Sequence, residues 1–206
     1  MNLFQRFHLV FVLCLSCAFV LPISAAQPDE RDRQVLETLM QHLLADSKFN
    51  MTRVSRKGST VVLDVRNPEK TGFLMSHQIR SEIGSRTLPN DAENDMRRRN
   101  TPTDSDPGKY DSAAAFYTNL TFGAGIVVTN LADLQKGRRS FTAFEDSQPK
   151  ARGHLVAYLP GYSKDGTRAV VRAGVGPSEH GAMLTAVLVK RDEKWSVEWY
   201  YVARFA

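Results

Sequence analysis

The last quarter of the chain, from Gly153 to Ala206, constrains the fold more than any other segment. It contains four short runs that are apolar or alternate between apolar and polar residues. Turn signals separate them: Asp165-Gly166, a loop at 174–181 and a polar stretch at 191–194. A period of two residues is typical of strands, and short turns join antiparallel neighbours. The pattern therefore predicts a four-strand antiparallel meander over about 153–206.

The final run of this segment is rich in aromatic residues. Strict alternation places one set on a single face: Trp195, Val197, Trp199, Tyr201, Ala203 and Phe205. The other face then holds Ser196, Glu198, Tyr200, Val202 and Arg204. Each aromatic ring that is buried removes about 150–250 Å² from water. We therefore expect the first face to anchor the core of the protein.

Helical patterns lie mainly before this segment. Residues 28–46 gather their apolar side chains on one helical stripe. Residues 88–99 begin with acids and end with bases, which suits the dipole of a helix. The other predicted elements are a hairpin over 51–66, a strand over 126–129 and helical turns over 131–145, with 72–86 open between helix and strand.

These elements predict an α+β fold class. We expect an antiparallel sheet, formed by the C-terminal meander, with the N-terminal helices packed on it. Residues 27–206 are long enough for a single domain with its own core. The proline-, aspartate- and serine-rich stretch at about 101–109 predicts a surface loop within that domain.

The N-terminus has the three parts of a secretory signal peptide over residues 1–26. Arg6 precedes an apolar stretch, and small residues follow up to Ala26. We predict cleavage after Ala26 and a secreted or periplasmic protein without a transmembrane segment in its mature part. The alternative is an anchor that stays uncleaved.

Both cysteines, Cys14 and Cys17, fall inside the predicted signal peptide. The mature chain would then contain no cysteine, which excludes thiol catalysis, disulfides and cysteine-ligated metals. The formal net charge of the whole chain is only +5. A small positive charge permits contact with an anionic envelope component, whereas export and the absence of a known module argue against nucleic-acid binding.

One loop contains residues with catalytic chemistry. Glu179 and His180 are adjacent there, and His154 begins an earlier strand. A histidine beside a carboxylate can act as a general base, and two imidazoles with a carboxylate can hold a metal. Neighbours in sequence seldom point at one reacting atom, so the plainer interpretation is an ordered loop in which His180 bonds the backbone. We expect no metal and no cofactor.

Three charged groups have plainer interpretations than binding sites. Asp104, Asp106 and Asp111 lack the glycine and final glutamate of a calcium loop, so we interpret them as a solvated loop. Arg97–Arg99 suit a helix C-terminus. Lys136, Arg138 and Arg139 suit a solvated turn.

The segment Pro160–Gly166, with His180-Gly181-Ala182, Leu188–Asp192 and Trp195-Ser196-Val197, resembles the C-terminal part of exported bacterial proteins of uncharacterised function. Arg98-Arg99-Asn100 and the strand at 127–131 fit the same pattern. The closing turn and tryptophan strand are also similar to the last hairpin of nuclear-transport-factor-2-like domains. The resemblance implies a shared sheet, on a fold that serves both enzymes and binding modules.

The function that we expect from the sequence is therefore non-catalytic binding of a small ligand or an envelope partner. The alternative is a small hydrolase or a metal-dependent enzyme that uses His154, His180 and Glu179. A third hypothesis is attachment to an anionic envelope surface through Arg97–Arg99.

Overall fold

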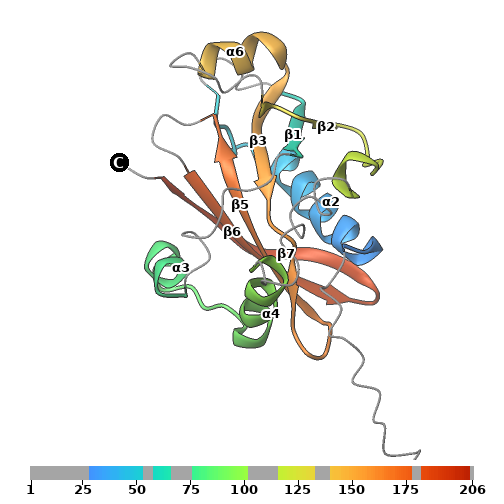
Figure 1. Cartoon of the computed structure of the whole chain (residues 1–206), viewed down its shortest axis with the longest axis vertical. Coiled ribbons are helices and arrows are strands. Elements are labelled where there is room, and N and C mark those ends of the chain that lie inside the picture. The colour runs from blue at the N-terminus through green and yellow to red at the C-terminus, as the bar shows by residue number, and fades with distance from the viewer. Residues whose placement is uncertain are drawn as a thin grey trace, which may run out of the picture.

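The computed structural model describes residues 28–52, 58–65, 76–101, 116–132, 140–177 and 182–204. The elements in chain order are α2 (Glu30–Ala45), β1 (Thr60–Asp64), α3 (Ser76–Ile83), α4 (Asn90–Asn100), β2 (Ile126–Thr129), α6 (Ser140–Ser147), β3 (Ala151–Ala157), β4 (Gly161–Tyr162), β5 (Arg168–Gly176), β6 (Ala182–Arg191) and β7 (Lys194–Arg204). The sheet lies at the centre, with α2 on one face and α3 and α4 on the other (Figure 1).

The strands form one mixed sheet of order β2-β1-β3-β5-β6-β7, and the short β4 pairs with β5. The last four strands in this order are antiparallel neighbours, which confirms the predicted meander. β1 is parallel to both β2 and β3, so the prediction of a purely antiparallel sheet was wrong. Long connections that contain helices join β1 to β2 and β2 to β3, and such connections return the chain to the same end of a sheet. The predicted α+β fold class is confirmed.

The predicted hairpin over 51–66 was also wrong. Of its first strand, residues 51 and 52 are described and are not in a strand. The backbone N–H of Met51 donates to the carbonyl of Arg152, 2.7 Å away, so this segment lies against β3 and not against β1. β1 instead finds its hydrogen-bond partners in β2 and β3.

The helices predicted over 28–46 and 88–99 are confirmed as α2 and α4, and the ambiguous segment at 72–86 contains the helix α3. Asp29 caps α2: its carboxylate accepts from the Asp32 backbone N–H, and the Asp32 carboxylate accepts from the Asp29 backbone N–H. This reciprocal capping box satisfies two donors that a helix start leaves open. The apolar stripe of α2 is buried against the sheet.

A β-bulge at Glu198 changes the alternation of β7. Val187 pairs with Trp199, whereas the next residue, Leu188, pairs with Val197. Glu198 therefore has no opposite residue on β6. One extra residue in a strand reverses the face on which all later side chains lie.

The bulge divides the aromatic residues of β7 between the two faces. Trp195 and Tyr200 belong to the core on the α2 side. Trp199 packs with the core under α3 and α4. The prediction of one aromatic face was wrong, because strict alternation assumes that no residue is inserted.

A buried ion pair joins the helices on the two sides of the sheet. Arg99 in α4 donates to both carboxylate oxygens of Asp32 in α2, at 2.7 and 2.8 Å, and both side chains are almost fully buried. The hydroxyl of Tyr162 donates to the same carboxylate at 2.8 Å, and Arg99 also donates to the Pro160 carbonyl. Burial, and then the negative charge of Asp32, raise the pKa of the Tyr162 hydroxyl.

The end of α4 also holds the chain between β3 and β4. The side-chain amide of Asn100 bonds both backbone groups of Leu159, each at 2.8 Å. β4 then passes so close to α4 that a Cβ at Gly161 would lie 2.2 Å from the Ala92 oxygen and the Met96 nitrogen. Only glycine allows this approach.

Loss of the buried ion pair is expected to destabilise the fold strongly. Asp32→Asn leaves Arg99 buried without its counter-charge, and such losses cost about 3–5 kcal/mol of unfolding free energy. Urea unfolding measures the change. The control is Arg33→Gln on the same helix, which breaks partly exposed pairs with Glu30 and Glu37 and should cost about 1 kcal/mol or less. Equal costs for the two variants would contradict a structural role for the buried pair.

Gly161→Ala is expected to lower stability by about 3 kcal/mol or more, because backbone atoms of α4 occupy the space of the new Cβ. The matched control is Gly174→Ala, whose new Cβ would meet only Val156 at 3.9 Å. Thermal unfolding of both variants provides the measurement. The close approach of β4 to α4 is refuted if Gly161→Ala unfolds at the temperature of the Gly174→Ala protein.

Candidate functional site

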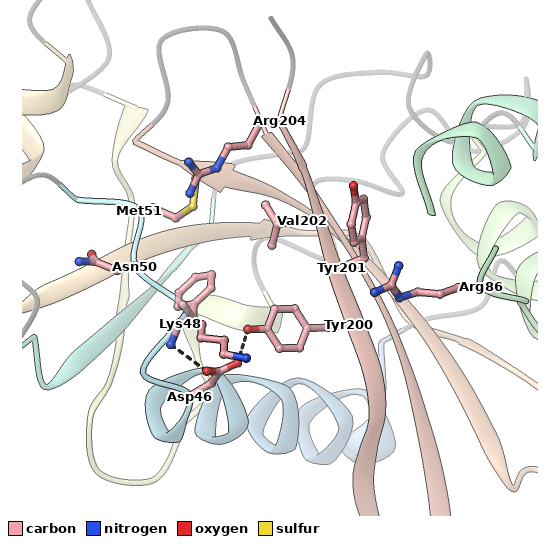
Figure 2. A pocket seen from close by; sticks show the side chains of 10 residues that line it. Asp46, Lys48, Asn50, Met51, Arg86, Tyr200, Tyr201, Val202 and Arg204 are labelled. Atoms are coloured by element: carbon pink, nitrogen blue, oxygen red, sulfur yellow. Dashed lines mark hydrogen bonds between the residues drawn. The ribbon is translucent and has the colours of Figure 1, made fainter. Parts of the chain in front are cut away.

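A pocket of about 380 Å³ lies beside the C-terminal half of β7 (Figure 2). Its walls come from the turn after α2 (residues 46 and 48–51), from Arg86 after α3, and from β7 (residues 200–202 and 204). A volume of this size is within the range of small-molecule sites.

The turn after α2 owes its position to the way in which the helix ends. The backbone N–H of Asp46 closes the last turn on the His42 carbonyl at 2.9 Å. The Phe49 side chain is then buried in the core on the α2 side, which fixes the following residues against the sheet. Arg152 reinforces the turn, since its guanidinium donates to the carbonyls of Leu44 and Asp46, each at 2.9 Å.

Tyr200 and Asp46 form the polar contact at the floor of the pocket. The Tyr200 hydroxyl donates to the Asp46 carboxylate, and the Lys48 backbone N–H donates to the same carboxylate at 2.8 Å (Figure 2). These hydrogen bonds, that of Tyr200 first, lower the pKa of Asp46. Burial and the bond to Asp46 raise the pKa of Tyr200. The ring of Tyr200 is held from the other side by an edge-on contact with His42.

Three cationic side chains line the pocket: Lys48, Arg86 and Arg204. Arg86 lies over the ring of Tyr201, 4.8 Å from its centroid. Within the described residues none of the three forms an ion pair, whereas most other described arginines do. The pocket therefore sets three cations against the single carboxylate of Asp46, beside two tyrosine rings.

A second hollow, of about 770 Å³, lies between the start of α2, α4 and the turn after β4. Its polar groups already bond one another. Asp91 accepts from the Lys164 backbone N–H at 2.9 Å, and Asp95 accepts from the Tyr162 backbone N–H at 3.0 Å. Arg31 covers the ring of Tyr162 at 3.6 Å. These contacts join α4 to β4, so we interpret the hollow as part of the packing.

The structure describes one of the three predicted catalytic candidates. His154 is buried in β3, and its ring packs on Phe144 at 5.0 Å. A Cβ at the paired Gly176 would lie 2.3 Å from the ring, so the imidazole fills the space between two strands. Glu179 and His180 lie outside the described residues. The carboxylate of Asp165 is in the turn before β5, at the end of that strand opposite Gly176, so it lies far along the strand from His154.

Of the three charged clusters that the sequence analysis considered, the structure describes Arg97–Arg99. Arg97 and Arg98 pair with Glu93 and Asp95 on their own helix, as expected for a helix end, but Arg99 turns inward to Asp32. The predicted acidic loop with Asp104, Asp106 and Asp111 lies outside the described residues, as do Lys136, Arg138 and Arg139. In the part of the chain that the structure describes, no cluster of three metal-binding side chains occurs.

The pocket residues could not have been found from the sequence. Lys48, Arg86 and Arg204 are single cations in three unrelated segments, and no spacing links them. The only signal was the pair Tyr200-Tyr201 near the end of the meander. Among the helices of the described residues, none has the length and apolar character needed to cross a membrane.

The contact between Tyr200 and Asp46 predicts a pH-dependent stability. The pKa of the Asp46 carboxyl is lower in the folded protein than in the unfolded chain. The charged carboxylate therefore stabilises the fold above the unfolded pKa, and this stabilisation is lost as the pH falls through the folded pKa. Tyr200→Phe should therefore cost about 1 kcal/mol at neutral pH and progressively less toward pH 3. Urea unfolding from pH 3 to 7 measures this.

The control for this variant is Tyr201→Phe, because the Tyr201 hydroxyl makes no hydrogen bond to the described residues. Its cost should not vary with pH between 3 and 7. A constant cost of Tyr200→Phe over the same range would show that its hydroxyl does not act through the Asp46 carboxylate.

The chain was compared with protein-family models, curated proteins and solved structures. No protein-family model, curated protein or solved structure matches the chain significantly.

Proposed function

We propose that this chain is a non-catalytic, exported binding domain whose pocket beside β7 takes a small ligand with a carboxylate on a ring. The signal-like N-terminus and the predicted cut after Ala26 support a secreted or periplasmic location. The proposal depends on the pocket formed by the turn after α2, Arg86 and β7.

The observation that carries the proposal is the set of Lys48, Arg86 and Arg204, which line one pocket without ion-pair partners in the described part of the chain. The carboxylate of the pocket, Asp46, already accepts from Tyr200 and from the backbone. Part of its acceptor capacity is therefore used within the protein. An anion is the ligand that this arrangement favours, and an arginine matches the planar shape of a carboxylate.

The apolar surface of the pocket supports a ring on the ligand. Tyr200, Tyr201, Val202 and Met51 present ring and aliphatic surface beside the cations. Tyrosine contributes apolar area together with a polar tip, so it suits ligands that are partly apolar. Both a sugar acid and an aromatic acid have this chemistry, and the experiment must distinguish them.

The enzymatic alternative has no comparable support. The ring of His154 fills a space between β3 and β5, and its candidate partners Glu179 and His180 lie outside the described residues. It stays a prediction from the sequence.

The proposal is tested by calorimetric titration of the protein with glucuronate, benzoate and, as the neutral counterpart, glucose. One of the two acids should bind and glucose should not, and added NaCl should weaken the binding. Arg86→Gln and Arg204→Gln should each weaken it by about tenfold or more, as expected for a lost charge-assisted hydrogen bond.

The matched control is Arg191→Gln, an exposed arginine at the other end of the hairpin formed by β6 and β7. It should leave the affinity unchanged. The proposal is wrong if neither acid binds at millimolar concentration, if glucose binds as well as glucuronate, or if Arg191→Gln has the same effect as the pocket variants.

A further inference from the structure

Arg172 is a fully buried arginine at the centre of the sheet, on the face that α3 covers. Its Nη1 donates to the Thr185 hydroxyl at 2.9 Å. Its Nη2 lies 2.8 and 3.0 Å from the two carboxylate oxygens of Glu82, which is in α3. Its Nε has no hydrogen-bond partner among the described residues. A buried donor without a partner is uncommon and costs stability.

The contact with Glu82 uses only one nitrogen of the Arg172 guanidinium. A carboxylate binds arginine best with two parallel bonds to two nitrogens. Here both oxygens share the single nitrogen Nη2, and the adjacent Nε is left open. Burial lowers the pKa of Arg172, in opposition to the nearby Glu82. The Nε donor is therefore open to a carboxylate that bonds two nitrogens at once.

The strand register connects Arg172 with the pocket beside β7. Arg172 is paired with Thr185 on β6, and Thr185 is paired with Tyr201 on β7. The three side chains therefore form a row across three neighbouring strands, on one face of the sheet. Strands are about 4.8 Å apart, so the row spans roughly 10 Å. Tyr201 and the overlying Arg86 line the pocket at the outer end of this row (Figure 2).

The helix α3 and the residues just after it cover this row. Ile79 and Ile83 are the buried apolar residues that α3 contributes to the core beneath it. Its polar attachments in the described residues are the bond of Glu82 to Arg172, the exposed contacts of Arg80 with Asn90 and Glu93 of α4 and, just beyond its end, the contact of Arg86 with Tyr201. Both ends of the row are thus covered by one short segment, 82–86.

We infer that Arg172 is an interior anion-binding group, that Glu82 occupies it as an internal substitute for a ligand carboxylate, and that α3 is a cover which such a ligand displaces. The inference rests on the proposed function for the nature of the ligand, a carboxylate that meets the cations of the pocket first and Arg172 only after Glu82 has left. It adds a regulated site: binding at Arg172 requires Glu82 to leave.

The test removes Glu82 and supplies a carboxylate from solution. Glu82→Ala should lower the melting temperature by roughly 10 °C, because Arg172 loses its counter-charge. Sodium acetate should then restore several degrees in a saturable manner, relative to NaCl at the same ionic strength. If the alanine variant does not fold, Glu82→Gln keeps the shape of the side chain and replaces it in the same titration.

The control is the double variant Glu82→Ala with Arg172→Met, in which no guanidinium is left to bind acetate. It should show no saturable rise. The anion-binding role of Arg172 is overturned if acetate stabilises the single and the double variant equally.

Displacement of α3 is tested in the unmodified protein by amide hydrogen exchange. Whichever of glucuronate or benzoate binds should accelerate exchange in residues 76–83 but not in α4. Unchanged exchange in α3 at saturation would overturn its role as a cover.

The two proposals can fail separately. Acetate rescue of Glu82→Ala, without any effect of Arg86→Gln or Arg204→Gln on acid binding, would refute the pocket and retain the Arg172 site. Acid binding that depends on Arg86, without acetate rescue, would give the opposite conclusion.

Discussion

The ion pair between Asp32 and Arg99 is the contact on which the arrangement of layers depends. It connects α2, on one face of the sheet, with α4, on the other, and Tyr162 of β4 bonds the same carboxylate. An ion pair without access to water is costly unless every donor and acceptor is satisfied. Here Asp32 accepts from Arg99, from Tyr162 and from the capped start of its own helix. The pair therefore fixes the start of α2 relative to α4 and β4.

Residue patterns along the chain predicted the local elements well and the long-range relations poorly. The apolar stripe of α2 and the alternation from β5 to β7 are properties of neighbouring residues, so the sequence displays them directly. The parallel pairing of β1 depends on where long connections return the chain, and no local pattern records that. The bulge at Glu198 is a single insertion within an otherwise regular alternation. It moved Trp199 to the opposite face from Trp195, against the prediction.

The candidate site was hidden for a similar reason. Lys48, Arg86 and Arg204 come from a turn, a helix end and a strand, and only the fold gathers them. Arg172 has no sequence signal either, because an arginine in an alternating strand is normally expected to face solvent. In this protein its strand is covered on both sides, and Glu82 on α3 meets it. His154, whose chemistry was more obvious in the sequence, is instead enclosed in the sheet.

The bulge in β7 has one more consequence, which concerns self-association. β7 has eleven residues, and in the described part of the chain only β6 pairs with it. A long, regular strand at the margin of a sheet is a template on which other chains can aggregate. The inserted Glu198 breaks the regular spacing of backbone donors and acceptors at mid-strand and adds a charge there. The same residue that upset the aromatic pattern thus protects the protein from growing into fibres along that margin.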